Sequence, residues 1–210
     1  MLQCTRSVWF GCVEMALEEL PRFIQDNYAV HEWRHASAVL QKDFNAEWKD
    51  LIKVLTGFRL KKSHISVGGG GKSNVSKSID EEFEKLGWRE KKFKTEIKVD
   101  ENTYASPTHS IDCYKNKVGL EIEWNNKTEF YDRDLNNYRL LFELRVISVG
   151  IIITRCDELQ DIFESLGRGS SYGNSTTILS KLLYKLEGGS GGGCPTLVFG
   201  ITKKLYDDKS

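Results

Sequence analysis

The run Val-Gly-Ile-Ile-Ile-Thr at residues 149–154 is the feature of this sequence that most limits its fold. Apart from the glycine, every residue in it is β-branched, and none is charged. A strand with one face in water alternates polar and apolar residues, whereas a strand buried on both faces is apolar throughout. We therefore expect residues 149–154 to form a central strand of a sheet.

Helices and further strands are expected on both sides of this run. Periodic apolar spacing predicts helices in four segments, which are residues 12–58, 76–86, 135–144 and 157–166. Shorter alternating or apolar runs predict four more strands, at residues 88–99, 108–114, 117–124 and 196–201. This order indicates an α/β fold, a mixed sheet flanked by helices. We expect a single domain over residues 1–210, with a helical N-terminal part at 1–60 and a sheet core at 88–205.

The charge of the chain is balanced, with 30 basic and 30 acidic residues. This argues against a protein that holds nucleic acid by net charge alone, because such binding comes from neutralising phosphates. It does not exclude DNA binding, since acidic metal ligands would mask basic residues in the sum. The five cysteines include no C-x-x-C pair, which argues against a zinc ribbon. The sequence has neither a signal-peptide pattern nor an apolar run of membrane-spanning length, so we expect a cytoplasmic protein without a membrane partner.

Three carboxylates lie in two neighbouring expected strands. Asp112 stands near the end of the first strand, and Glu121 and Glu123 stand on the second. Residues two apart on a strand point to the same face, so Glu121 and Glu123 project together, and the apolar Leu120 and Ile122 point to the other face. A tight turn at Lys115-Asn116 would bring Asp112 beside them. The pattern therefore predicts three carboxylates on one side of a sheet.

Carboxylates that share a buried face repel one another and lose hydration, and a divalent cation relieves both costs. Mg²⁺ prefers oxygen ligands and usually keeps several waters and a substrate phosphate. The flanking residues are apolar, and the polar cluster Asn125-Asn126-Lys127 follows at once. Both features favour a ligand site over the alternative, an exposed strand with an acidic edge. We expect a Mg²⁺ site, with Mn²⁺ as its substitute.

The same three residues carry a family resemblance. Asp112, followed nine residues later by Glu121 and then by Glu123, resembles the catalytic motif of the PD-(D/E)XK nucleases. Most of that superfamily has lysine in the third position, whereas this chain has Glu123. BamHI is similar in having glutamate there, while BglII and BstYI have glutamine. The departure removes one group that could activate a water, so activation would fall to the metal or to Glu123.

The segment before the motif also resembles type II restriction endonucleases of the BglII/BstYI kind. It has a long helix with Phe44 and Trp48, then a polar loop, then a helix that ends at Gly87-Trp88 before the strands. The resemblance covers about residues 35–205.

This resemblance implies a Mg²⁺-dependent endonuclease that hydrolyses DNA phosphodiester bonds at a short palindromic site and leaves 5′-phosphate ends. It implies that Asp112 and Glu121 are metal ligands and that Glu123 binds or orients the attacking water. Ser76 is the best match to a polar active-site residue on the preceding helix, and Asn126 resembles an asparagine that contacts DNA. The expected partners are double-stranded DNA and a second copy of the chain, since a two-fold dimer matches a palindrome.

Further DNA contacts are expected on physical grounds. A helix N-terminus favours anions, so Lys72, Ser73 and Asn74 are expected to hold a phosphate. Asparagine and arginine can read base edges, and small polar loop residues can enter a groove. The residues of these kinds are Asn125, Asn126, Lys127, Arg133, Ser170, Ser171, Tyr172 and Asn174. Two other interpretations stay open, a helix cap at Asp134 with solvated neighbours and a mobile connector at residues 167–175.

Two different functions were weighed for the whole chain. Gly70-Gly71-Lys72-Ser73 invites comparison with a nucleotide-binding P-loop, but Ser66 replaces the first glycine of that motif. We therefore expect no nucleotide cofactor. The other alternative is a non-catalytic module that binds DNA or a protein on a degenerate nuclease core, and Glu123 in place of lysine keeps it open.

Overall fold

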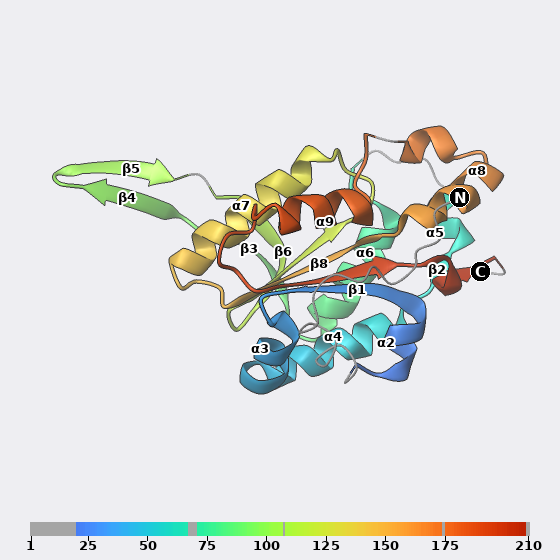
Figure 1. Cartoon of the computed structure of the whole chain (residues 1–210), viewed down its shortest axis with the longest axis horizontal. Coiled ribbons are helices and arrows are strands. Elements are labelled where there is room, and N and C mark those ends of the chain that lie inside the picture. Colours follow the sequence, from blue (N-terminus) through green and yellow to red (C-terminus); the bar gives the residue numbers. More distant parts are fainter. Residues whose placement is uncertain (1–19, 67–70, 107, 174, 209–210) are drawn as a thin grey trace.

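A mixed sheet of six strands runs through the centre of the protein (Figure 1). The structure is a computed structural model that describes residues 20–66, 71–106, 108–173 and 175–208. In sheet order the strands are β1 (Tyr28–Trp33), β9 (Thr196–Ile201), β8 (Val149–Arg155), β7 (Val118–Glu123), β6 (Ser110–Lys115) and β3 (Arg89–Lys92). Strands β7, β8 and β9 are parallel, and the other neighbours pair antiparallel. The expected α/β fold with a mixed sheet is confirmed.

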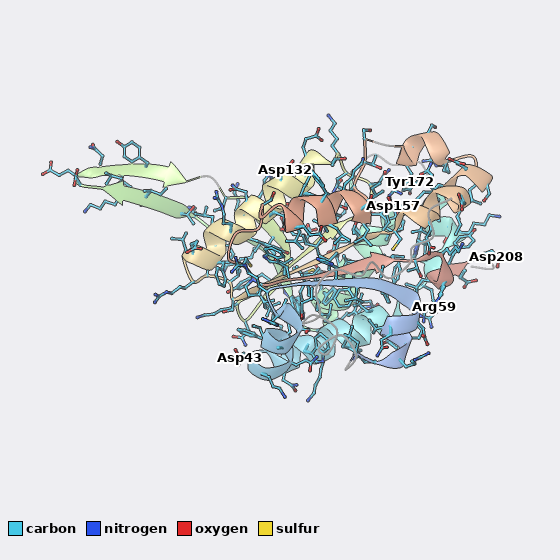
Figure 2. The ribbon with its side chains drawn as sticks, viewed as in Figure 1. Asp43, Arg59, Asp132, Asp157, Tyr172 and Asp208 are labelled. Carbon is cyan, nitrogen blue, oxygen red and sulfur yellow. The ribbon has the colours of Figure 1, made fainter. Side chains whose placement is uncertain are left out.

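Helices cover both faces of this sheet, as expected (Figure 1). One face carries α7 (Glu129–Glu143) and α9 (Leu179–Glu187). The other face carries α2 (Arg22–Asn27), α3 (Ala36–Asp43), α4 (Asn45–Gly57) and α6 (Asn74–Lys85). Smaller elements are β2 (Leu60–Lys61), α5 (Lys62–Ser66), η1 (Asp157–Leu159), α8 (Gln160–Ser165), η2 (Gly169–Tyr172), η3 (Lys203–Leu205) and β10 (Tyr206–Asp207). Side chains fill the space between the layers (Figure 2). Among the described residues, no helix combines the length and the apolarity needed to cross a bilayer.

The central strand β8 is buried at every position, which confirms the expectation from its sequence. Its Gly150 pairs with Gly119 of β7, and the ring of Tyr138 from α7 packs over both glycines. A Cβ atom on Gly150 would lie 2.4 Å from Tyr138 Cδ2, so only glycine leaves room for the ring. This close approach brings α7 against β7, the strand that carries Glu121 and Glu123.

The expectation of a helical region over residues 12–58 is wrong in its middle. Strand β1 interrupts it and pairs antiparallel with β9 along its whole length. Its residues Tyr28 and Glu32 are buried on one face of the sheet. Apolar residues this close together fit either period, and the open edge of β9 decides in favour of a strand. Residues 12–19 lie outside the described part of the chain.

The single strand expected at residues 88–99 is also wrong, because the structure divides it. After β3 the chain leaves the sheet, and β4 (Thr95–Val99) pairs with β5 (Asn102–Ser106) in a ribbon of their own. The ribbon projects from the body of the molecule (Figure 1). At the division the ring of Phe93 packs edge-on against Tyr114, with 5.2 Å between ring centroids. This contact holds the chain to the sheet at the point where the ribbon begins.

Candidate active site

The site begins at a hairpin between β6 and β7. The two strands are joined by Asn116 and Lys117, both with positive φ, 43° and 66°, as a two-residue hairpin turn requires. The turn lies one residue later than the expected Lys115-Asn116. Lys91 of β3 pairs with Ile111 of β6, and Arg89 pairs with Tyr114. Two residues of β6 therefore lie opposite one residue of β3. This β-bulge falls at Asp112-Cys113, and bulges of this kind re-aim side chains beside active sites.

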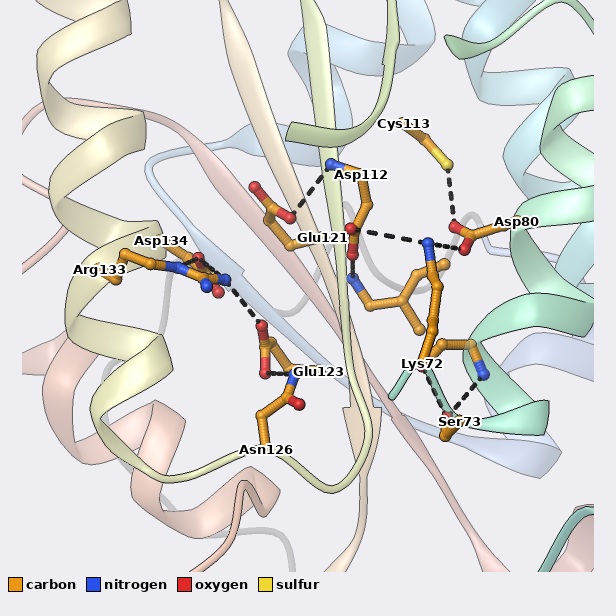
Figure 3. Close-up of polar contacts among 12 residues, drawn as sticks. Lys72, Ser73, Asp80, Asp112, Cys113, Glu121, Glu123, Asn126, Arg133 and Asp134 are labelled. Carbon is orange, nitrogen blue, oxygen red and sulfur yellow. Dashed lines mark hydrogen bonds and ion pairs between the residues drawn. The ribbon is translucent and has the colours of Figure 1, made fainter. Parts of the chain in front are cut away.

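At the bulge, side chains replace the hydrogen bonds of the sheet (Figure 3). Regular pairing of β6 with β7 reaches only Cys113 and Leu120. Beyond that point the Asp112 backbone N–H donates to Glu121 Oε2 at 3.3 Å, and the Ile122 N–H donates to Asp112 Oδ2 at 3.1 Å. The two strands therefore separate where their carboxylates meet, and Asp112 and Glu121 lie together as expected from the sequence.

Glu121 and Glu123 face helix α7, and the neighbouring apolar residues Leu120 and Ile122 face the opposite core. Both side chains are almost completely buried, each residue with 1% of its surface exposed. Glu123 accepts hydrogen bonds from Asn126 Nδ2 at 2.7 Å and Arg133 Nη2 at 3.3 Å. Arg133 Nε also donates to Asp134 at 2.7 Å. The helix α7 thus adds Asp134, a fourth carboxylate, and Arg133, a cation between two of the four (Figure 3).

The interpretation of Asp134 as a helix cap is wrong. Helix α7 begins at Glu129, before the expected residue 135, so Asp134 lies inside the helix and is fully buried. Asp134 is one of the buried residues of α7, so its carboxylate points to the sheet rather than to the end of the helix.

Burial raises the pKa values of three of these carboxyl groups. Burial, followed by the charge of Asp134, raises the pKa of Glu123 to about 9. Burial also raises the pKa of Glu121 well above its usual value, with repulsion from Asp134 and Asp112 as further causes. The pKa of Asp134 is raised by burial, against the opposing effect of Arg133. The cluster holds more negative charge than Arg133 neutralises, so it favours either protons or a further cation.

The chemistry of these side chains fits a magnesium ion. Glu121 Oε1 is buried and has no hydrogen-bond partner, so one carboxylate oxygen beside Asp112 is unsatisfied. In the described part of the chain, no three His, Cys, Asp or Glu side chains are positioned to hold a metal by themselves. Asp112 and Glu121 would therefore supply two ligands, and waters and phosphate the rest, as is usual for Mg²⁺.

A second set of charges approaches Asp112 from α6 and the residues just before it, and one member, Asp80, was missed in the sequence. Asp80 of α6 is 8% exposed, accepts a hydrogen bond from Cys113 Sγ at 3.4 Å and forms an ion pair with Lys72. The Lys72 ammonium also lies 3.8 Å from Asp112 Oδ1. Burial raises the pKa of Asp80, against the opposing effect of Lys72.

Ser76, the residue selected on this helix from the sequence, lies one turn before Asp80. Its hydroxyl is 2.8 Å from that of Ser73, the residue that caps α6 by accepting from the Ser76 N–H. The structure therefore places Ser76 at the helix start, and its catalytic role stays a prediction. An acidic residue next to the buried Ile79 and Phe83 is unusual, and this signal could have identified Asp80.

Comparison with known families bears on what this cluster does. The family model described as restriction endonuclease BglII/BglIII matches residues 28–201, from the first residue of β1 to the last of β9. The chain belongs to this family. It is a restriction endonuclease, an enzyme that hydrolyses DNA, and the matched span contains Asp112, Glu121 and Glu123. A comparison with curated proteins gives no significant match.

The expected DNA-contacting residues of this endonuclease fall into two regions. Lys72 faces the carboxylates, Ser73 caps α6, and Asn74 is exposed at the first position of that helix. Lys127, Ser170 and Ser171 are exposed, Asn125 is partly buried, and Asn174 lies outside the described residues. The DNA contacts of these residues stay predictions.

The segment after β7 is bound to the loop at residues 169–177. Asn125 Nδ2 donates to the Ser171 carbonyl at 3.0 Å, and the Asn126 carbonyl accepts from the Thr177 N–H at 2.8 Å. Lys127 forms an isolated β-bridge with Thr176. Since Asn126 also contacts Glu123, the loop and the carboxylate cluster belong to one hydrogen-bonded unit.

Tyr172 does not lie at the surface, so the expectation that it contacts DNA needs correction. It is 6% exposed, its ring stacks on Phe163 with 4.0 Å between centroids, and it packs edge-on against Trp124. Figure 2 places it beside α8 at the body of the molecule. An aromatic ring with this much apolar contact is more stable inside than in water, so Tyr172 supports the loop from within.

Glu123→Gln is expected to stabilise the metal-free endonuclease near pH 8 by about 1 kcal/mol or more. The folded-state pKa of about 9 exceeds the usual 4.5, so protonated Glu123 favours folding at low pH. That stability is lost as the pH rises through this interval, and glutamine resembles the protonated form without titrating. Urea unfolding in EDTA between about pH 5 and pH 9 should show that the free energy of unfolding declines less steeply with pH in the variant than in the wild type.

The exposed Glu90→Gln serves as the matched control and should follow the wild type. Some decline should persist in Glu123→Gln, because the pKa values of Glu121 and Asp134 are also raised. Identical pH profiles for wild type and Glu123→Gln would contradict the assignment.

Proposed function

We propose that this restriction endonuclease depends on Mg²⁺ and cleaves both strands of a short palindromic DNA site. The observation that carries the proposal is the meeting of Asp112 and Glu121 where β6 and β7 separate. One oxygen of Glu121 is buried there without a partner. Two carboxylates at an opening of the sheet, one of them unsatisfied, favour a hard divalent cation, and Mn²⁺ would substitute for Mg²⁺.

Each residue of the cluster has a defined task in this proposal. Asp112 and Glu121 would hold Mg²⁺, which when bound lowers the pKa of a water and stabilises the leaving 3′ oxygen. In its ionised form, Glu123 would orient the attacking water and take up its proton. Asn126 and Arg133 hold Glu123 in place through the contacts at 2.7 and 3.3 Å.

The chemical step is the hydrolysis of one phosphodiester bond. The oxygen of the water attacks phosphorus, the bond from phosphorus to the 3′ oxygen breaks, and that oxygen takes up a proton. The products are a 5′-phosphate and a 3′-hydroxyl. A second copy of the chain would cut the other strand, because the two-fold symmetry of a palindrome is matched by a homodimer.

DNA recognition in this proposal uses the segment 125–128 and the loop 169–177. These segments are hydrogen-bonded to each other and to Glu123, so contacts made by Asn125, Lys127 or Ser171 bear on the catalytic cluster. Asn74 at the start of α6 would add a phosphate contact on the other side of the site.

A second candidate function is DNA binding without cleavage on a degenerate core. The structure offers one observation in its favour, since Lys72 and Arg133 already neutralise part of the acidic cluster. A metal is then less necessary to stabilise the fold. The unsatisfied Glu121 Oε1 favours the enzyme, because neither cation bonds to it.

Digestion of phage λ DNA tests the proposal directly. The purified protein in Mg²⁺ should give discrete fragments, and the same protein in EDTA should give none. Glu121→Gln keeps the shape of the side chain but removes its charge, so it should leave the DNA intact. The exposed Glu90→Gln should cut as the wild type does. If the wild type binds DNA but leaves it intact in both Mg²⁺ and Mn²⁺, the non-catalytic alternative is favoured.

A further inference from the structure

Lys72 occupies an unusual place for a lysine at a helix N-terminus. It directly precedes Ser73, the cap of α6, but its side chain turns toward the sheet instead of outward (Figure 3). The ammonium forms an ion pair with Asp80 and lies 3.8 Å from Asp112 Oδ1. It thus connects helix α6 to the strand that carries a proposed metal ligand.

The ammonium of Lys72 lies near Asp112 Oδ1, an oxygen that could coordinate a divalent ion. Asp112 Oδ2 accepts the hydrogen bond of the Ile122 N–H, and Lys72 is the cation beside Oδ1. Asp80 is buried on the other side of the ammonium and is the second carboxylate that the same lysine neutralises. A divalent ion that approached this position would meet the positive charge of Lys72 at short range, where repulsion is strong.

We propose that Lys72 is an internal counter-cation that competes with the divalent ion for Asp112 and Asp80. In the protein without DNA, Lys72 stabilises the acidic cluster and weakens metal binding. The lysine is 43% exposed at its side chain, so its ammonium is free to leave Asp112 when another anion is offered. The phosphate of DNA is such an anion, and its arrival would open Asp112 to the metal. This inference rests on the proposed metal site at Asp112 and Glu121.

Calorimetric titration with Ca²⁺ in the absence of DNA tests the competition. Lys72→Met keeps much of the aliphatic chain but removes the charge, and it should lower the dissociation constant for Ca²⁺ at least about tenfold. Lys72→Arg keeps the charge and should bind Ca²⁺ no more tightly than the wild type. Lys77→Met removes an exposed charge from the same helix and should also match the wild type.

Thermal unfolding provides a second readout that does not depend on cleavage. Lys72→Met leaves Asp80 and Asp112 without their cation, so it should unfold at a lower temperature than the wild type in EDTA. Ca²⁺ should raise its unfolding temperature more than that of the wild type. If Lys72→Met fails to fold in EDTA, Lys72→Gln, an uncharged side chain that can still donate hydrogen bonds, takes its place in both measurements.

The outcomes separate this inference from the proposed function. Equal Ca²⁺ affinity in the wild type and Lys72→Met would overturn the competition and leave the metal site standing. Tighter binding in Lys72→Met and in Lys77→Met alike would also overturn it, because the effect would then be one of net charge. Ca²⁺ binding by none of the variants would overturn both the competition and the metal site.

Discussion

Asp112→Asn is expected to slow DNA cleavage at least about a thousandfold, a loss of about 4 kcal/mol of transition-state stabilisation. Asparagine is nearly isosteric and can still accept the hydrogen bond of the Ile122 N–H, so the hairpin keeps its geometry. What is lost is one of the two negative charges that would hold the cation beside Glu121. The measurement is the single-turnover rate on λ DNA in Mg²⁺, with enzyme in excess.

Asp43→Asn is the matched control for this prediction. Asp43 is the last residue of helix α3 and is exposed at the edge of the molecule (Figure 2). Asp43→Asn should cleave at the wild-type rate. Both variants should unfold at the temperature of the wild type or at a slightly higher one. A rate for Asp112→Asn within about tenfold of the wild type would contradict the role of Asp112 as a metal ligand.

Gly150→Ala should destabilise the fold by about 2 to 3 kcal/mol, the largest effect expected from adding a single methyl group. The new Cβ atom would lie 2.4 Å from two atoms of the Tyr138 ring. The ring is fully buried and its hydroxyl donates to the Ile151 carbonyl at 2.7 Å, so it has little room to move. Displacing Tyr138 would shift α7, which carries Arg133 and Asp134, and cleavage should fall as well.

Urea unfolding of three variants tests this packing argument. Gly57→Ala, at the end of α4, has nothing within 4 Å of the added atom and should be neutral or slightly stabilising. Gly150→Ala combined with Tyr138→Leu should lose less stability than the sum of the two single changes, because the clash is removed with the ring. Additive losses would contradict a direct conflict between the methyl group and the ring.

The central parts of the fold follow directly from local sequence pattern. Residues 149–154 of β8 are uncharged and β-branched apart from Gly150, and every residue of the strand is buried. The hairpin of β6 and β7 follows from alternation on both sides of Asn116-Lys117, and with it the common face of Glu121 and Glu123. These elements are specified by residues close together in the chain, so the sequence predicts them well.

The elements that the sequence does not predict depend on distant partners. Strand β1 exists because β9 offers an open edge, and its first residue, Tyr28, pairs with Ile201, which lies 173 residues later in the chain. The division of β3 from β4 depends on where β6 begins, because Lys92, the last residue of β3, pairs with Ser110, the first residue of β6. Helix α9 is different, because the buried Leu179, Leu182 and Leu186 have helical spacing that could have identified it.

The site likewise combines residues that are close together in the sequence with residues that only folding brings together. Asp112, Glu121 and Glu123 lie within one hairpin and could be found from their spacing. Asp80 comes from α6 and Lys72 from the residues just before it, on the opposite face of the sheet from α7, and only folding brings them to Asp112. The β-bulge that turns Asp112 toward both sets of charges has no signal in the sequence. Lys72 and Arg133 were expected from the sequence to contact DNA, and only the structure shows that they pair with the carboxylates.

Anomalous diffraction from crystals of the protein in excess Mn²⁺ tests the central claim, that Asp112 and Glu121 form a divalent-metal site. An excess of Mn²⁺ is needed because Lys72 competes for the same carboxylate. The account predicts an anomalous peak at about 2.1 Å from an oxygen of Asp112 and from Glu121 Oε1, with the ammonium of Lys72 moved away from Asp112. A peak that involves neither carboxylate, or no peak between them in crystals of Lys72→Met, would contradict the account.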